Sequence, residues 1–101
     1  MNHGLSQETL EKIGNVLEEI QGVQRAVLYG SRAKGTHTPG SDIDLTLIGN
    51  TLTLRDLKRL MVLLDDLLLP YTIDLSLFHL IENQELREHI ARVGITLYQR
   101  L

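Results

Sequence analysis

Three aspartates stand where their carboxylates can act together. Asp42 and Asp44 are two residues apart in a segment that alternates polar and apolar residues, so both side chains leave the same face of one strand. Asp74 lies on the polar side of a second alternating segment. Carboxylates on one sheet face repel one another unless they are protonated, solvated or bound to cations. Oxygen clusters of this kind suit hard ions such as Mg²⁺, and two such ions can assist phosphoryl transfer.

A second candidate group begins at Gly30-Ser31, directly after an apolar run, and includes Arg32 and Lys34. Glycine lets a backbone approach a phosphate closely, and N–H groups at the start of a helical turn attract anions. The Ser31 hydroxyl can donate to a phosphate oxygen, and the two cationic side chains can contact a polyphosphate. The glycine spacing and the Gly-Lys-Ser/Thr ending of a Walker A loop are absent. The run therefore predicts a different kind of phosphate site.

Each of these residues also has a purely structural interpretation. An Asp-x-Asp pair can be the solvated face of a strand, and Asp74 can be an exposed edge residue. Ser31 can be a helix N-cap, and Arg32 and Lys34 can be exposed loop charges. The functional interpretation is favoured because the Gly-Ser turn, the aspartate pair and the third strand aspartate occur together.

Composition limits the class of protein. The chain has 101 residues, and we expect residues 1–101 to form one domain. The absence of cysteine excludes disulfide scaffolds, zinc–cysteine sites and thiol catalysis. The formal net charge is −3, from 10 basic and 13 acidic residues, so no basic excess drives nucleic-acid binding. Without the three aspartates singled out above, the chain is neutral.

The length of the apolar runs and the number of aromatic residues exclude further classes of protein. The apolar runs are far too short to span a bilayer, and the first residues lack the pattern of a signal peptide, so we expect a cytoplasmic protein. Only 4% of the residues are aromatic, too few for a base-stacking platform. We therefore expect no membrane association and no direct binding of nucleic acid.

Helices alternate with strands along the chain. Apolar spacing predicts helices at about 7–21, 53–69 and 83–93, strands at 23–29, 42–48 and 72–78, and an optional edge strand at 95–98. About a dozen residues join the first two strands, too few for a helical crossover, so these strands are expected to be antiparallel or splayed apart. The predicted fold class is α/β (α+β-like), a small mixed sheet of three to four strands with helices packed mainly on one face.

Two of the predicted helices have surfaces outside their buried stripes. The polar residues of the last helix, His89 among them, are most simply a solvated face. The helix at 53–69 has apolar residues outside its buried stripe, and such a surplus can mark a partner surface. These residues are Leu54, Val62, Leu63 and Leu68.

Taken together, the motifs resemble a known signature. Gly30-Ser31, ten intervening residues and then Asp42-Ile43-Asp44 are similar to the signature of the DNA polymerase β nucleotidyltransferase superfamily. The run Tyr-Gly-Ser-Arg-Ala-Lys-Gly and the later Ser-Asp-Ile-Asp-Leu most resemble its minimal nucleotidyltransferase (MNT) branch. Asp74 matches the third carboxylate of that family, and the resemblance covers nearly the whole chain. It implies the nucleotidyltransferase fold.

The resemblance also implies a reaction. A nucleoside monophosphate, AMP from ATP or the equivalent from another NTP, would pass to an acceptor hydroxyl with release of pyrophosphate, assisted by Mg²⁺, with two ions expected. Asp74 would share one ion and help to activate the acceptor. The implied catalytic and metal-binding residues are Asp42, Asp44 and Asp74, and the implied nucleotide-binding residues are Gly30, Ser31, Arg32 and Lys34.

Finally, the resemblance implies a partner. Stand-alone MNT proteins are often paired with a small helical HEPN protein, and some pairs resemble toxin–antitoxin systems in which the MNT antitoxin adds AMP to its partner. A second hypothesis is a non-catalytic, nucleotide-binding scaffold subunit of a two-protein complex, which the small size of the chain favours. Three carboxylates facing one site favour the enzyme, because a pure scaffold does not need them.

Overall fold

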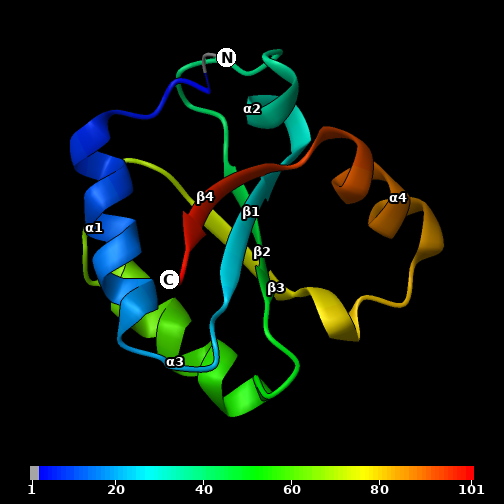
Figure 1. The fold of residues 1–101 in the computed structure, drawn as a ribbon. Helices are drawn as coiled ribbons and strands as arrows, with labels where there is room; N and C mark the ends of the chain where they lie inside the picture. The colour runs from blue at the N-terminus through cyan, green and yellow to red at the C-terminus, as the bar shows by residue number, and fades with distance from the viewer. Residues whose placement is uncertain (1–2) are drawn as a thin grey trace.

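The computed structural model describes residues 3–101, in which helices and strands alternate (Figure 1). In chain order the elements are α1 (Gln7–Glu18), β1 (Arg25–Tyr29), α2 (Gly30–Lys34), β2 (Ile43–Ile48), α3 (Leu54–Asp65), β3 (Ile73–Leu77), the 3₁₀ helix η1 (Phe78–Leu80), α4 (Gln84–Val93) and β4 (Ile95–Gln99). The optional edge strand is therefore present as β4. Helix α3 ends at Asp65, earlier than the expected residue 69. The N–H groups of Leu67 and Leu68 donate to the carbonyl oxygens three residues before them, and Leu68 leaves the helical conformation with a φ of 53°.

The four strands form one mixed sheet in the order β3-β2-β1-β4. Strands β1 and β2 are antiparallel, which is one of the two arrangements expected from the short connection between them, and β4 pairs antiparallel with the other side of β1. Strands β2 and β3 are parallel and are joined through α3. This arrangement makes β2 the neighbour of both β1 and β3, so residues from three strands meet along it.

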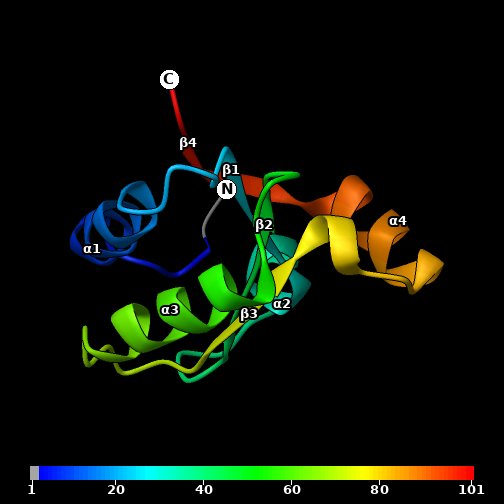
Figure 2. The same ribbon diagram turned by 90° about the horizontal axis from the view of Figure 1, so that it is seen from below.

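The sheet has helices on both faces, and the two faces differ in chemistry (Figure 2). Helices α1 and α3 cover one face, where the main core includes the 0% exposed side chains of Ile43, Leu45 and Leu47 from β2. Helix α4 covers part of the other face, where a smaller cluster forms around Val27, Tyr29 and Ile90. The expected arrangement with helices mainly on one face is confirmed, and α4 is the exception. Side chains alternate along a strand, so the polar residues of β2 and β3 fall on the α4 face.

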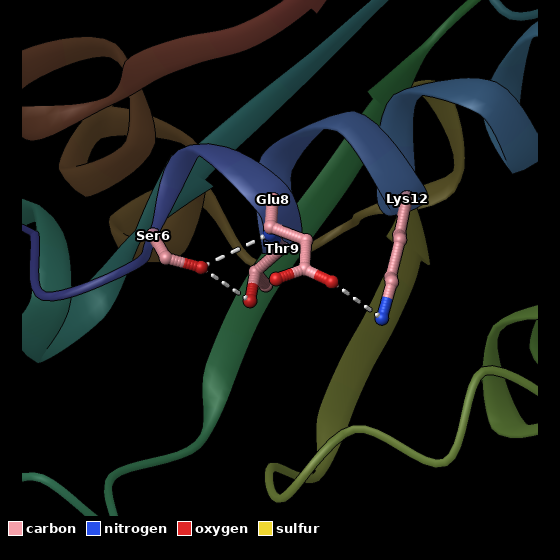
Figure 3. A network of polar contacts seen from close by, with 4 residues as sticks. All are labelled: Ser6, Glu8, Thr9 and Lys12. Carbon is pink, nitrogen blue, oxygen red and sulfur yellow. Dashed lines mark hydrogen bonds and ion pairs between the residues drawn. The ribbon is translucent and has the colours of Figure 1, made fainter.

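Side-chain caps fix where the two long helices of the main core begin. Ser6 accepts a hydrogen bond from the backbone N–H of Thr9 at 3.1 Å at the start of α1 (Figure 3). One turn later, Lys12 and Glu8 form an ion pair with an N–O distance of 3.3 Å (Figure 3). Thr53 forms a full capping box at the start of α3. Serine and threonine are favoured N-cap residues, and each cap satisfies backbone donors that a helix leaves unpaired.

The end of the chain is tied to the end of α1 by one arginine. Arg100 follows β4 and donates to the carbonyl oxygens of Val23 at 2.9 Å, Ile20 at 3.0 Å, Glu18 at 3.2 Å and Leu17 at 3.5 Å. The last carbonyl groups of a helix have no intrahelical partner, so a cation with several donors is well suited to them. Arg100 therefore holds β4, α1 and the α1–β1 connection together.

Part of the apolar surface stays uncovered. Leu54, Val62 and Leu68 are exposed, as expected for residues outside the buried stripe. Leu63, in contrast, is partly buried and packs against the main core. Val62 and Met61 line part of an apolar hollow between α3 and β3. In the part of the chain that the structure describes, no helix is long and apolar enough to cross a membrane.

The role of Arg100 leads to a stability prediction. Replacing it with alanine leaves the carbonyl groups of Val23 and Glu18 without a protein donor, whereas those of Ile20 and Leu17 keep a backbone donor. Arg100→Ala is therefore expected to lower the free energy of unfolding by about 1–3 kcal/mol. For a chain of this size, each kcal/mol corresponds to roughly 4–8 °C in Tm. Thermal unfolding measures the change. Arg92→Ala, at an exposed position of α4, is the matched control and should leave Tm within about 2–4 °C; equal Tm values for the two variants would contradict the assigned role.

Candidate active site

The sheet register brings two of the three predicted carboxylates together. Asp44 on β2 lies directly opposite Asp74 on the parallel strand β3, and opposite Tyr29 on the antiparallel strand β1. Neighbouring strands are about 4.8 Å apart, so these three side chains start from adjacent positions on the α4 face of the sheet. Asp42 precedes β2 and is exposed.

The carboxylates influence one another electrostatically. Burial raises the pKa of the Asp44 carboxyl, and the negative charges of Asp74 and Asp42 raise it further, while His89 acts in the opposite direction. No salt bridge to these three aspartates is found among residues 3–101. The negative charge of the group is therefore uncompensated within the described chain.

The group suits a hard cation, although it is not a preformed cage. All its donors are carboxylate oxygens, the ligands that Mg²⁺ prefers. Within residues 3–101, no three His, Asp or Glu side chains are gathered as a metal-binding group. Asp42 and Asp74 are exposed and Asp44 is half-buried, so the outer two side chains have room to rearrange around an ion. The residues fit a bound metal by their chemistry and their uncompensated charge.

Gly30 connects the phosphate-type turn to this acidic group. The residue follows β1 directly and has a φ of +74°, a conformation that favours glycine. A Cβ atom built on Gly30 would overlap the Oδ2 atom of Asp44. The sequence pattern Gly-Ser and the later Asp-x-Asp are therefore in direct contact in space, and a side chain at residue 30 would require the Asp44 carboxylate to move.

The other predicted phosphate contacts differ in their surroundings. Ser31 is half-buried at the start of α2, and its carbonyl oxygen accepts from the backbone N–H of Thr36 at 3.0 Å, which closes the turn. Lys34 is exposed at the end of α2, before Gly35 ends the helix in a left-handed conformation. Both residues stay candidates for contact with a nucleotide.

Arg32 has a different position from the one that the sequence predicts. Its side chain is 1% exposed, and its guanidinium donates to the carbonyl oxygens of Ser41 at 2.9 Å and 3.1 Å, Pro39 at 3.2 Å and His3 at 2.9 Å. The guanidinium carbon also lies 4.7 Å from the ring centroid of Tyr71. This arrangement leaves almost no surface for the predicted phosphate contact. We assign Arg32 to the frame of the site, where it holds the loop before Asp42.

Two further residues border the site and were not expected there. His89, predicted to lie on a solvated face, is half-buried, and its Nε2 accepts from the backbone N–H of Gly30 at 3.3 Å. The rings of Tyr29 and His89 meet edge to face at 6.2 Å. Burial raises the pKa of the Tyr29 hydroxyl, a hydrogen bond with Ser76 opposes this shift, and the charges of Asp74 and Asp44 reinforce it. The local sequence gives no signal for these contacts, because His89 and Gly30 are 59 residues apart.

Comparison with known proteins gives a family match for most of the chain. Residues 11–101 match the family model described as polymerase beta, nucleotidyltransferase. A search of curated proteins finds no significant match.

Several solved structures are similar to this chain. The chain is 26% identical, with a TM-score of 0.73, to a toxin–antitoxin structure with AMP-PNP, over 90% of this chain and 73% of that one. It is 22% identical, with a TM-score of 0.71, to a structure of a tri-AMPylated HEPN toxin in complex with an MNT antitoxin from Shewanella oneidensis, over 95% and 74% of the two chains. For a toxin–antitoxin MntA–HepT structure the identity is 23% and the TM-score 0.69, over 94% and 74%.

The contact between Gly30 and Asp44 leads to a prediction with two controls. Gly30→Ala combines a strained φ with an overlap on Asp44, so we expect it to lower the free energy of unfolding by more than the roughly 1 kcal/mol of a strained position alone. Gly35→Ala has a similar φ of +78° with nothing within 4 Å, and Gly40→Ala has open space and no positive φ. Urea unfolding should rank the losses Gly30, then Gly35, then Gly40. Equal losses at Gly30 and Gly35 would show that the overlap is unimportant.

The raised pKa of Asp44 leads to a prediction about pH. The folded state binds the Asp44 proton more tightly than the unfolded chain does, so the ionised carboxylate at neutral pH costs stability. Asp44→Asn is therefore expected to be as stable as the wild type or more stable at pH 7. Its advantage should shrink as the pH falls through the folded pKa and vanish below the unfolded value of about 3.9.

Urea unfolding at several pH values, without divalent cations, tests this dependence on pH. Glu11→Gln, at an exposed position of α1, changes the net charge equally and is the control. An Asp44→Asn variant that is less stable than the wild type at pH 7 would contradict the assigned electrostatics.

Proposed function

The chain belongs to the polymerase β nucleotidyltransferase family, and from that premise we propose that it transfers AMP from ATP to a hydroxyl group of a small HEPN-type partner protein, as the antitoxin of a toxin–antitoxin pair. The observation that carries this proposal is the placement of Asp44 against Gly30 and opposite Asp74. A turn suited to phosphates and an acidic group suited to a metal thus adjoin on one open face of the sheet.

The proposal gives each residue of the site a task. Asp42 and Asp44 would hold Mg²⁺, and Asp74 would share an ion. Bound there, the metal would supply positive charge that offsets the charge of the triphosphate and of the pyrophosphate. The Gly30-Ser31 turn holds the β- and γ-phosphates, and Lys34 adds a positive charge near them.

The chemical step is a substitution at the α-phosphorus. The acceptor oxygen forms a bond to that phosphorus, the bond to the β-phosphate oxygen breaks, and pyrophosphate leaves. Asp74 takes up the proton of the acceptor hydroxyl, which its exposed position allows. Catalysis is then mostly positioning together with charge neutralisation, as in phosphoryl transfer generally.

The proposed partner is supported by the similar structures and by the surface of the chain. Two of the similar structures are described as a toxin–antitoxin with AMP-PNP and as an AMPylated HEPN toxin with its MNT antitoxin. The acidic group lies on the open face of the sheet beside α4, where Asp42 and Asp74 are exposed. An acceptor carried by a second protein can therefore approach without the site having to open.

Label transfer tests the proposed reaction. The chain is incubated with α-labelled ATP, Mg²⁺ and a purified HEPN-type protein from its own source cells, and label on that protein is measured by gel and located by mass spectrometry. Asp44→Asn is expected to reduce transfer by at least about 100-fold, the scale for loss of one charge-stabilising group. Glu11→Gln should transfer normally.

Two outcomes would contradict the proposal. Transfer by Asp44→Asn at the wild-type rate would remove the acidic group from the mechanism. A complex with the partner that forms normally, without transfer under any NTP and Mg²⁺ condition, would favour the scaffold hypothesis instead.

A further inference from the structure

His89 is tied to the backbone of the phosphate-type turn, although no motif of the sequence includes it. Its Nε2 atom accepts from the N–H of Gly30 at 3.3 Å, across 59 residues of chain. Gly30 is the residue at which the turn is pressed against Asp44. Because glycine has more backbone freedom than any other residue, a turn that begins at a glycine needs an external contact to hold one conformation. The hydrogen bond from His89 is such a contact.

Helix α4 presents this histidine from a fixed position. Ile90, next to His89, is 4% exposed and packs with Val27 and Tyr29 of β1 on the second face of the sheet. At the end of α4, a Cβ atom on Gly94 would come within 2.6 Å of a methyl carbon of Val27, so the helix end lies close against the strand. The edge of the Tyr29 or His89 ring meets the face of the other at 6.2 Å. The imidazole is therefore held by the packing of α4 rather than by the turn that it contacts.

We propose that His89 is a positioning residue of the nucleotide site, which holds the Gly30-Ser31 turn in its phosphate-binding conformation through the bond from Gly30 N–H to Nε2. The inference rests on the proposed function, since it concerns the NTP site named there.

The hydrogen bond also implies that Gly30 and Ser31 have different roles in the turn. The Gly30 N–H is already engaged by His89, so Gly30 contributes its conformation and its close approach to Asp44. The hydroxyl and N–H of Ser31 then provide the donors for a phosphate oxygen. In this arrangement the histidine stays bound to Gly30 when the nucleotide enters and is not displaced by it.

Nucleotide affinity and a backbone resonance test the inference together. Calorimetry measures the Kd of AMP-PNP in Mg²⁺ for the wild type, His89→Ala and His89→Gln, and ¹H–¹⁵N spectra follow the Gly30 amide. His89→Ala is expected to weaken binding about 3- to 10-fold, the equivalent of one hydrogen bond, and to shift the Gly30 amide resonance. Glutamine carries a carbonyl oxygen at a similar reach, so His89→Gln should restore most of the affinity and the resonance position.

Two control variants separate positioning from helix stability. Ile90→Val weakens the packing of α4 but keeps the imidazole and its hydrogen bond, so it should lower Tm and should weaken binding less than His89→Ala does. Arg92→Ala, exposed on the same helix, should change neither.

Each remaining result decides the question. Unchanged or tighter binding by His89→Ala would overturn the inference, because it would mean that His89 is inert or competes with the phosphate. An equal loss of affinity in Ile90→Val, or no rescue by glutamine, would reduce His89 to a packing residue. If the wild-type chain binds no NTP, the proposed function is wrong, and the inference about His89 is wrong with it. A loss of nucleotide affinity in His89→Ala alone is compatible with the proposed function.

Discussion

The pairing of Asp44 with Asp74 across the β2–β3 ladder is the constraint on which the rest of the site depends. Like charges opposite each other on adjacent strands destabilise a sheet, and no described cation within the chain offsets them. The other face of the same strands carries the fully buried residues of the main core. A strand that is anchored so strongly on one side can present an unfavourable pair on the other, because alternation along the strand makes the two faces independent.

The elements around this pair keep it in place and open. Arg32 is buried behind the turn, and its guanidinium donates hydrogen bonds to three carbonyl groups. Two of these belong to the loop that leads to Asp42. A buried cation without acidic partners is expensive unless its donors are satisfied, and backbone carbonyl groups satisfy them here without removing negative charge from the site. The arginine thereby shapes the loop, while the charge of the aspartates stays available for an external cation.

Helix α4 covers only part of the second face of the sheet. It packs on β1 through Ile90 and reaches the Gly30-Ser31 turn through His89, and it leaves Asp42 and Asp74 exposed. The apolar surplus of the molecule lies elsewhere, on α3 and beside β3, and leaves Leu54, Val62 and Leu68 uncovered. The proposed chemistry and the uncovered apolar surface thus occupy different parts of the chain, which suits a protein that acts on another protein.

Much of this architecture is encoded locally and can be deduced from the sequence. The alternation of helices and strands, the N-caps Ser6 and Thr53 and the polar positions of the three aspartates follow from periodicity and capping, which depend on neighbouring residues. The short connection between the first two strands excluded a helical crossover and left two arrangements, antiparallel or splayed apart, of which the structure has the antiparallel one.

Only the tertiary structure decided the neighbours of each side chain. Periodicity tells which face of a strand a residue occupies, but not that Asp74 stands level with Asp44. For the same reason it could not distinguish a buried Arg32 from a surface cation, or place His89 beside Gly30 at a separation of 59 residues. Such pairings are set by how whole elements pack, and that packing is decided by the burial of the core as a unit rather than by any short stretch of chain.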